Sequence, residues 1–354
     1  MQENQSGSGK RLGRRSFLMA AVAASPLFLS GCVGSAGGAS PAAEAGAFPV
    51  TVTHAFGSTT ITTAPTRIAT LGYASQDVCI ELGVVPVGVP QYELRGFGTS
   101  LWFNKAVTAM NAVMPSQYRD HDEVPYEELK ALKPDVILAV NSGISRAEYD
   151  RLTEIAPVVA YPGQPFGTDW RTTTTTVGKV IGRPQQAAEL IASVEAGIAE
   201  AKSSYTDLEG STFVYLGASQ ASGADFEVYD KDSNQVRILE DFGVVLSPVM
   251  AKVTAEGERK RVEAGTGPIL WESRRAGELE ADMNVVAVVS NKQAIVESEM
   301  LDGLPGAKHN SLVVVQTSDD ALALVEASPL GVKWATLTVL PELARAAYEA
   351  HKGA

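Results

Sequence analysis

Residues 184–205, "PQQAAELIASVEAGIAEAKSSY", decide how this chain is organised. Pro184 suits the first turn of a helix, and no later proline interrupts the run. With a rise of about 1.5 Å per residue, such a helix would be about 30 Å long, the width of a small domain. We predict a single helix that joins two α/β lobes, with a crossover helix inside one continuous sheet as the alternative. The residues that recur on one face at helical spacing are Leu190, Ile191, Val194 and Ile198.

Short apolar runs lie on both sides of this helix, each followed by a turn-rich loop and a helical pattern. Runs that are apolar on both faces and alternate with helices are typical of parallel strands covered on both sides. The sequence therefore predicts an α/β fold of two lobes, each with a mainly parallel sheet covered by helices. We place the N-terminal lobe at 48–183, the linking helix at 184–205 and the C-terminal lobe at 206–354. The predicted strands are 67–71, 84–89, 136–140, 158–160, 213–216, 244–246, 285–289 and 312–315.

The N-terminus has the pattern of an export signal. Basic residues between Lys10 and Arg15 precede an apolar run, 17–29, that is too short to span a bilayer. "RRSFL" resembles a twin-arginine signal, and "LSGC", ending at Cys32, resembles a lipobox whose cysteine takes a lipid. We predict a signal peptide at 1–31 and a lipid-anchored protein on the extracytoplasmic face of the membrane. A plain secretory signal with a chance cysteine is the alternative.

Residues 32–47 form a predicted tether. The stretch "SAGGASPAAEAG" is small and low in complexity, so it cannot bury enough surface to fold. The other cysteine, Cys79, lies in an apolar run and is expected to be a buried thiol. No segment after the signal reaches the roughly 18 uncharged apolar residues that a membrane helix needs.

Composition and motifs exclude several classes of protein. A formal net charge of −12 excludes nucleic acid as a partner. The sequence has no Gly-x-Ser-x-Gly motif, and its four histidines never pair at zinc-site spacing. These absences argue against an enzyme, and we expect no cofactor and no directly bound metal. An exported cofactor enzyme is the alternative from a different class.

Two α/β lobes place a cleft at the carboxyl ends of their strands. The loops expected there are rich in aromatic and polar side chains, and they include an arginine. This composition suits a bulky, partly apolar, negatively polarised ligand. For Trp271, burial in the core is the alternative. The predicted ligand-binding residues are Tyr73, Tyr92, Arg95, Trp102, Asn141, Ser142, Ser219, Tyr229, Arg237 and Trp271.

A series of segments carries a family pattern: 77–89, 124–138, 149–163, 177–191, 236–248 and 300–315. In this order they resemble the bacterial ABC-importer solute-binding proteins of the iron-siderophore, vitamin B12 and haem type. The resemblance covers nearly all of 48–347. It implies two lobes that are joined by one long helix, move little and hold a ligand between them. It also implies a monomeric lipoprotein that binds a ferric siderophore and delivers it to the permease subunits of an ABC importer for iron uptake.

The same resemblance implies two docking residues. "PYEELKALKPD" looks like the family segment whose first glutamate enters an arginine pocket of the permease, and Glu127 matches that position. "ILWESRRAGELEAD" looks like the counterpart in the second lobe, and Glu272 matches, although the spacing to Asp282 is longer than usual in the family. Exposed carboxylates suit this role because charges at the rim of an interface set orientation and encounter rate. A plain helix-start acid is the alternative for Glu127.

The nature of the ligand stays open at this point. The family also binds haem through Tyr or His axial ligands, for which His121 and Tyr229 are candidates, and cobalamin is a further alternative. A basic cluster at 259–261, with Arg274 and Arg275, would suit an anionic catecholate or citrate complex. Runs of like charge are usually solvated loops, and that interpretation favours a neutral hydroxamate instead.

Overall fold

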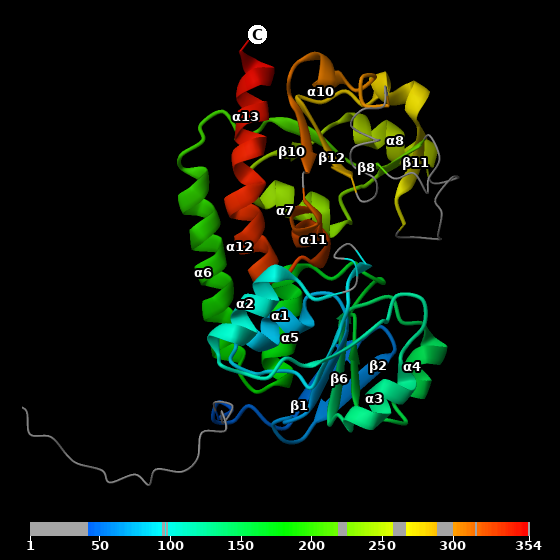
Figure 1. The fold of residues 1–354 in the computed structure, drawn as a ribbon, viewed down its shortest axis with the longest axis vertical. Coiled ribbons are helices and arrows are strands. Elements are labelled where there is room, and N and C mark those ends of the chain that lie inside the picture. Colours follow the sequence, from blue (N-terminus) through cyan, green and yellow to red (C-terminus); the bar gives the residue numbers. More distant parts are fainter. Residues whose placement is uncertain are drawn as a thin grey trace, which may run out of the picture. The chain divides into compact units, whose positions relative to one another are not determined.

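The computed structural model describes residues 42–93, 96, 98–218, 225–257, 267–288, 300–315 and 317–352. Across these residues the chain forms two α/β lobes, each built on its own sheet (Figure 1). The predicted signal peptide 1–31 and residues 32–41 of the predicted tether lie outside the described residues. The predicted fold class is confirmed.

The N-terminal lobe contains a sheet of five parallel strands in the order β5-β4-β3-β6-β7. An antiparallel hairpin of β1 and β2 precedes it. The strands are β1 Val50–His54, β2 Gly57–Ile61, β3 Ile68–Gly72, β4 Gly88–Pro90, β5 Ser116–Tyr118, β6 Val136–Asn141 and β7 Val158–Ala160. The helices are α1 Ser75–Glu81, α2 Leu101–Ala109, α3 Tyr126–Leu132, α4 Arg146–Leu152 and α5 Trp170–Val180.

Strand β6 shows why this sheet is covered on both faces. Successive side chains of a strand point to opposite faces. Val136, Leu138 and Val140 pack in a cluster with residues of α1 and α5, whereas Ile137 and Ala139 pack in a second cluster on the other face. All residues of β6 are buried. The continuous apolar run in the sequence is therefore a strand with two apolar faces.

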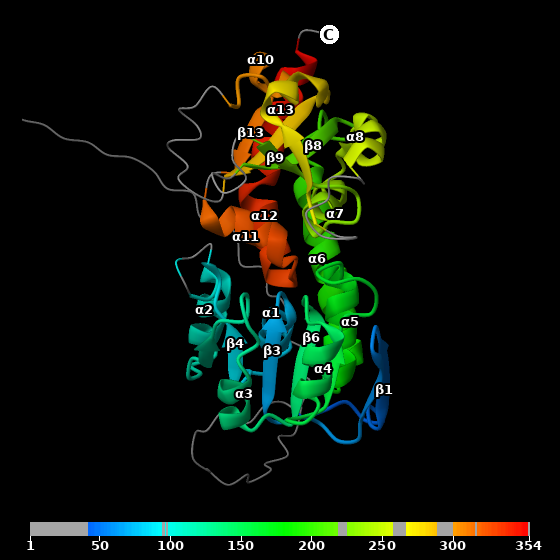
Figure 2. The same ribbon diagram turned by 90° about the vertical axis from the view of Figure 1, so that its right-hand side faces the viewer.

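The helix predicted between the lobes is present as α6, Pro184–Lys202. Pro184 lies in its first turn, and Ala187, Val194 and Ile198 are buried. Helix α6 packs against α5 of the first lobe and α12 of the second, and Figure 2 shows it leading from one lobe to the other. Because the two sheets are separate, α6 is not a crossover within one continuous sheet.

The C-terminal lobe contains a six-stranded sheet in the order β11-β9-β8-β12-β13, with β10 paired to the start of β8. Strands β8, β10, β12 and β13 are parallel, whereas β9 and β11 are antiparallel to their neighbours. The strands are β8 Thr212–Ala218, β9 Asp225–Val228, β10 Val245–Leu246, β11 Ile269–Glu272, β12 Met283–Val288 and β13 Leu312–Val315. The helices are α7 Asn234–Asp241, α8 Val249–Gly257, η3 Ser273–Glu278, α10 Pro305–Lys308, α11 Ser318–Glu326, α12 Pro329–Thr338 and α13 Leu340–His351.

One predicted strand, 84–89, begins later than expected. Gly83 has a positive φ of 77°, and the Val84 N–H bonds back to the carbonyl of Cys79, so the first apolar residues close α1 instead. Extended pairing starts only where the Val87 N–H reaches the carbonyl of Ile68. The strand proper is Gly88–Pro90.

Cys79 is buried in the core, as the sequence predicted. Burial raises the pKa of its thiol, because a thiolate is poorly solvated in an apolar surrounding. Within the described part of the chain, no helix is both long enough and apolar enough to cross a membrane.

Candidate functional site

Two buried carboxyl groups, one from each lobe, accept hydrogen bonds across the boundary between the lobes. Asp77 on α1 accepts a hydrogen bond from Ser328 Oγ at 2.5 Å. Glu326 at the end of α11 accepts from Tyr92 Oη at 2.8 Å and from Gln76 Nε2 at 2.5 Å. Both carboxyl groups are fully buried. We call this set of five side chains the carboxylate contact.

Burial changes the protonation of the carboxylate contact. It raises the pKa of Asp77 to about 7, against hydrogen bonds from Ser328 and Trp102 that favour the charged form. Burial, followed by the charge of Asp77, raises the pKa of Glu326 well above its usual value. The nearby Glu81 is itself paired with Lys333 at 2.5 Å. The contact therefore holds a proton at neutral pH.

Trp102 packs against the carboxylate contact and forms a hydrogen bond with Asp77. Its Nε1 donates to Asp77 Oδ2 at 2.6 Å, and its ring lies 5.6 Å from the ring of Trp334 on α12. The side chain is buried. The structure thus places this predicted ligand-binding residue inside the packing between the lobes.

A second contact joins α7 of the C-terminal lobe to the segment before α5. Asn234 Nδ2 donates to the carbonyls of Phe166 and Thr168 at 3.3 Å and 3.2 Å. Arg237 Nη1 donates to the carbonyl of Gly167 at 2.8 Å. Arg237 was predicted to bind ligand, and in the structure its side chain forms a hydrogen bond between the lobes. We call this the α7 contact.

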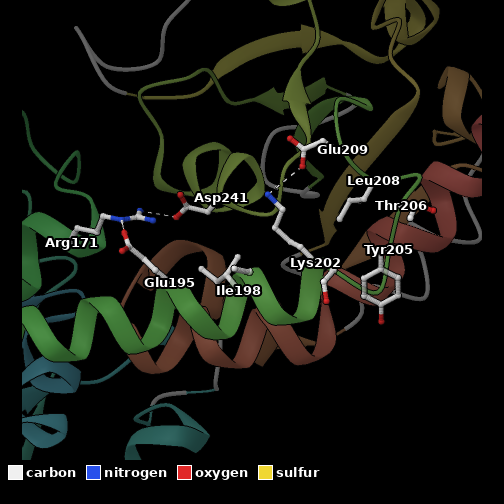
Figure 3. A pocket seen from close by; sticks show the side chains of 11 residues that line it. Arg171, Glu195, Ile198, Lys202, Tyr205, Thr206, Leu208, Glu209 and Asp241 are labelled. Atoms are coloured by element: carbon white, nitrogen blue, oxygen red, sulfur yellow. Dashed lines mark hydrogen bonds and ion pairs between the residues drawn. The ribbon is translucent and has the colours of Figure 1, made fainter.

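Asp241 extends the α7 contact to the side of α6. It accepts from Trp170 Nε1 at 3.0 Å and from Arg171 Nη1 at 2.9 Å. Arg171 also donates to Glu195 on α6 at 2.6 Å, so one guanidinium ties three helices (Figure 3). A cavity of about 570 Å³ opens beside these residues, and Lys202 in its lining is paired with Glu209 at 3.4 Å.

An aromatic cluster adjoins both contacts. It consists of Tyr73, Tyr92 and Phe166 from the N-terminal lobe and Tyr215 and Tyr229 from the C-terminal lobe. Tyr73 stacks on Tyr92 of the carboxylate contact, with ring centroids 5.5 Å apart and an interplanar angle of 16°. It also lies 5.9 Å from the ring of Phe166, which is 50% exposed. From the other lobe, Tyr229 packs edge-on against Tyr215 at 5.4 Å. Burial raises the pKa of Tyr229 well above its usual value, and nearby Glu227, Tyr215 and Tyr73 raise it further.

The ends of β3 and β6 set the position of Tyr73. Gly72 has a positive φ of 74°, and a Cβ there would lie 2.3 Å from the carbonyl oxygen of Asn141. This close approach lets the Tyr73 N–H donate to that oxygen at 2.8 Å. Among the described residues, neither polar atom of the Asn141 side-chain amide has a hydrogen-bond partner, although the residue is only 1% exposed. A buried amide without a partner is unusual in a folded protein.

The phenols of the cluster are neutral hydrogen-bonding groups at physiological pH. Burial raises the pKa of Tyr73 to about 12, and the charges of Asp120, Glu326 and Glu93 add to the effect. The hydroxyl of Tyr229 lies 3.3 Å from Glu227 Oε2. The cluster therefore combines aromatic faces with neutral hydroxyl groups, an amide and one carboxylate.

The structure brings together only part of the predicted site. Tyr73, Tyr92, Asn141 and Tyr229 meet at or beside the cluster. Ser142 is buried next to them and donates to the carbonyl of Ala139 at 2.9 Å. Arg95 and Ser219 lie outside the described residues.

Trp271 lies elsewhere. It pairs with Phe226 across β11 and β9, is buried in a core cluster with it, and donates to the carbonyl of Arg275 at 3.2 Å. Glu227, the next residue along β9, points to the opposite face, because successive side chains of a strand alternate. The core alternative considered for Trp271 therefore describes its position.

Sequence reasoning missed Phe166 and Glu227. Phe166 has a positive φ of 54°, and its proline- and glycine-rich surroundings, "YPGQPFG", are the signal that marks an exposed turn. Glu227 lies in β9, a short strand with charged residues that carries no strong apolar pattern.

The two predicted docking residues lie in different lobes. Glu127 is exposed in the first turn of α3. Glu272 ends β11, is about one-third exposed and pairs with Arg274 at 2.5 Å. His121, considered above as a haem ligand, is 69% exposed and lies 3.6 Å from Asp122.

Comparison with known sequences identifies a family. Residues 68–224 match the family described as "Periplasmic binding protein". The "Putative ABC transporter substrate-binding lipoprotein YhfQ" of Bacillus subtilis (strain 168) is 26% identical over 162 residues, which is 43% of this chain and 46% of that relative. The match therefore spans about half the length of this curated relative.

Solved structures extend the likeness. The iron-uptake ABC transporter substrate-binding protein PiaA from Streptococcus pneumoniae TIGR4 is 25% identical, with a TM-score of 0.71 over 85% of this chain and 100% of that chain. PiaA in complex with ferrichrome gives a TM-score of 0.72 at 25% identity, over 84% and 99%. SirA from Staphylococcus aureus, complexed with staphyloferrin B, shares the fold at 21% identity, with a TM-score of 0.62 over 86% and 98%. Residues 68–224 of the chain thus resemble the periplasmic binding protein family, and the fold of the chain resembles that of ABC transporter substrate-binding proteins.

Proposed function

We propose that this protein is the substrate-binding component of an ABC importer and that it captures a ferric siderophore for iron uptake. The observation that carries the proposal is the aromatic cluster between the lobes, where Tyr73 lies near Tyr229 and next to Asn141, whose side-chain amide has no hydrogen-bond partner among the described residues. Aromatic faces with a few convergent polar groups are the usual composition of a small-molecule site. The likeness to PiaA, which was solved in complex with ferrichrome, supports this ligand class.

The chemistry of the cluster suits an iron chelate. A ferric siderophore presents oxygen atoms and amide groups around a partly apolar shell. Neutral phenols donate hydrogen bonds to such oxygens, and the Asn141 amide both donates and accepts. Rings of Tyr73 and Phe166 supply apolar area. The protein contacts the shell of the chelate and supplies no ligand to the iron itself.

We further propose that Glu127 and Glu272 dock onto the permease subunits and that a lipid on Cys32 holds the protein at the extracytoplasmic face. The protein acts as a monomer, with lobes at 48–183 and 206–354. Exposure of Glu127 on a short helix supports the docking role, because rim charges direct the encounter with a partner.

Titration calorimetry of the protein with ferrichrome tests the binding proposal. Tyr73→Ala should weaken binding by about thirtyfold or more, because truncating a central aromatic contact costs about 2 kcal/mol or more. Tyr73→Phe keeps the ring and measures the hydroxyl alone. Tyr348→Ala, which removes an exposed tyrosine of α13, is the control and should bind as the unmodified protein does. Absence of binding across ferric hydroxamates, catecholates and citrates would refute the proposal.

A further inference from the structure

Glu227 is an acidic residue beside the aromatic cluster that no basic residue of the described part of the chain neutralises. Among the described residues its side chain forms no ion pair, and its hydrogen-bond partner is the hydroxyl of Tyr229 at 3.3 Å. It is partly exposed, unlike the two carboxyl groups of the carboxylate contact, which are fully buried. Its carboxyl group is therefore accessible beside the aromatic cluster.

The sheet is shaped to hold this carboxylate. Strand β9 runs antiparallel to β8 and places Glu227 opposite Gly217. A Cβ at Gly217 would lie 3.0 Å from Glu227 Oε2 and 3.4 Å from the ring of Tyr229. Glycine at this position leaves the space in which both side chains stand against the sheet.

The charge of Glu227 acts on the surrounding phenols. Burial raises the pKa of Tyr215, and Glu227 raises it further; the same two causes act on Tyr229. On the N-terminal side, the charges of Asp120 and Glu326 add to burial in raising the pKa of Tyr73. Acids of both lobes therefore act on the phenols of the cluster.

Arg237 takes part in the α7 contact and forms no ion pair with Glu227. Arg237 is engaged by the carbonyl of Gly167 at 2.8 Å and lies 4.0 Å from Asp232. These partners belong to the C-terminal lobe and to the segment before α5. Nothing in the described part of the cluster favours a negatively charged chelate.

We infer that Glu227 selects the ligand by charge, favouring a ferric chelate with a pendant ammonium group over its neutral or anionic counterpart. This inference rests on the proposed function and sharpens it. A partly exposed carboxylate and an ammonium group attract each other modestly in solvent, so the preference should be about threefold to tenfold. Added salt should reduce it, because the pair is reachable by ions.

A matched pair of ligands isolates this charge. Ferrioxamine B carries a free ammonium group, and its N-acetyl derivative has the same iron site without the charge. The unmodified protein should bind ferrioxamine B about threefold to tenfold more tightly than the acetylated form. In Glu227→Gln this ratio should fall to about one, since the amide oxygen still accepts from Tyr229 but carries no charge. Glu280→Gln, which removes an exposed acid of the same lobe, is the control and should keep the ratio.

Two results would overturn the inference. One is an unchanged ratio in Glu227→Gln with thermal stability equal to that of the unmodified protein, and the other is tighter binding of an anionic ferric tris-catecholate than of ferrioxamine B. If both ferrioxamines bind but the ratio of their affinities is the same in the unmodified protein and in Glu227→Gln, only the charge selection is refuted. If the unmodified protein binds no ferric chelate, the proposed function fails as well.

Discussion

Asp77 and Glu326 lie near each other across the lobes, and among the described residues no basic residue is in hydrogen-bond contact with either. Each carboxyl group accepts its side-chain hydrogen bonds through one oxygen, and in the part of the chain that the structure describes the other oxygen, Asp77 Oδ1 or Glu326 Oε2, has no hydrogen-bond partner. Burying a charged carboxylate is costly unless it is paired, so the folded protein favours the protonated form. This arrangement links the folding of the protein to pH.

Stability should therefore fall as pH rises from about 4, the ordinary carboxyl value, towards 7. The raised pKa of Asp77, about 7, means that the folded state holds a proton that the unfolded state releases in this range. One such proton changes the free energy of unfolding by about 1.4 kcal/mol per pH unit. Asp77→Asn removes this titrating group and should flatten the profile, as measured by urea unfolding at several pH values.

Glu280→Gln serves as the control for this pH profile, because Glu280 is exposed. Its removal should leave the slope unchanged. A slope in Asp77→Asn equal to that of the unmodified protein would show that the carboxylate contact does not titrate in this range.

The guanidinium of Arg171 pairs with two acidic residues, and the contributions of these two pairs to stability can be compared. Arg171 contacts Asp241 on α7 and Glu195 on α6, whose side chains are 20% and 46% exposed. Only Asp241 also accepts from Trp170, so it joins the lobes. We predict that Asp241→Asn lowers the free energy of unfolding by about 1–3 kcal/mol, whereas Glu195→Gln costs about 1 kcal/mol or less.

Denaturant unfolding of both variants measures this difference. Equal losses would mean that the α7 contact contributes no more than an exposed ion pair. The comparison is matched, since each variant replaces a carboxylate by an amide of the same shape.

Elements with a strong local pattern were predictable, and elements that depend on distant partners were not. Strand β6 and helix α6 carry continuous or periodic apolar residues, so their sequences indicate them directly. Strand β9, "DFEV", is short and half charged, and it pairs antiparallel to β8 on the far side of residues 219–224. Nothing local in its sequence marks it as a strand.

The same distinction applies to the site. Tyr73 and Asn141 follow predicted strands, and parallel strands bring their carboxyl ends to one edge, so their proximity was expected. Arg237 and Trp102 were predicted to bind ligand from composition alone. Their actual contacts, a carbonyl of the other lobe and a buried carboxylate, follow from the packing of the two lobes, which no local pattern encodes.

The proposed docking role of Glu127 can be tested in the assembled transporter. We predict that Glu127→Ala leaves the affinity for the ferric chelate unchanged but lowers uptake by cells severalfold, because Glu127 is exposed in α3, outside the aromatic cluster. Calorimetry measures the affinity, and uptake of radioactive iron in the chelate measures transport. The neighbouring Glu128, exposed in the same helical turn, supplies the control Glu128→Ala.

Loss of ligand affinity in Glu127→Ala would place this residue in the binding site instead. An equal loss of uptake in Glu128→Ala would indicate a general effect of charge at the helix start and no specific docking role.

The carboxylate contact and the α7 contact join the lobes through groups of the protein itself. An empty molecule and a loaded molecule would then present nearly the same surface to the permease. Empty copies would compete with loaded copies for the transporter, so iron import would depend on the fraction of binding protein that is loaded as well as on its amount. For such a carrier, making more protein without more chelate would slow import.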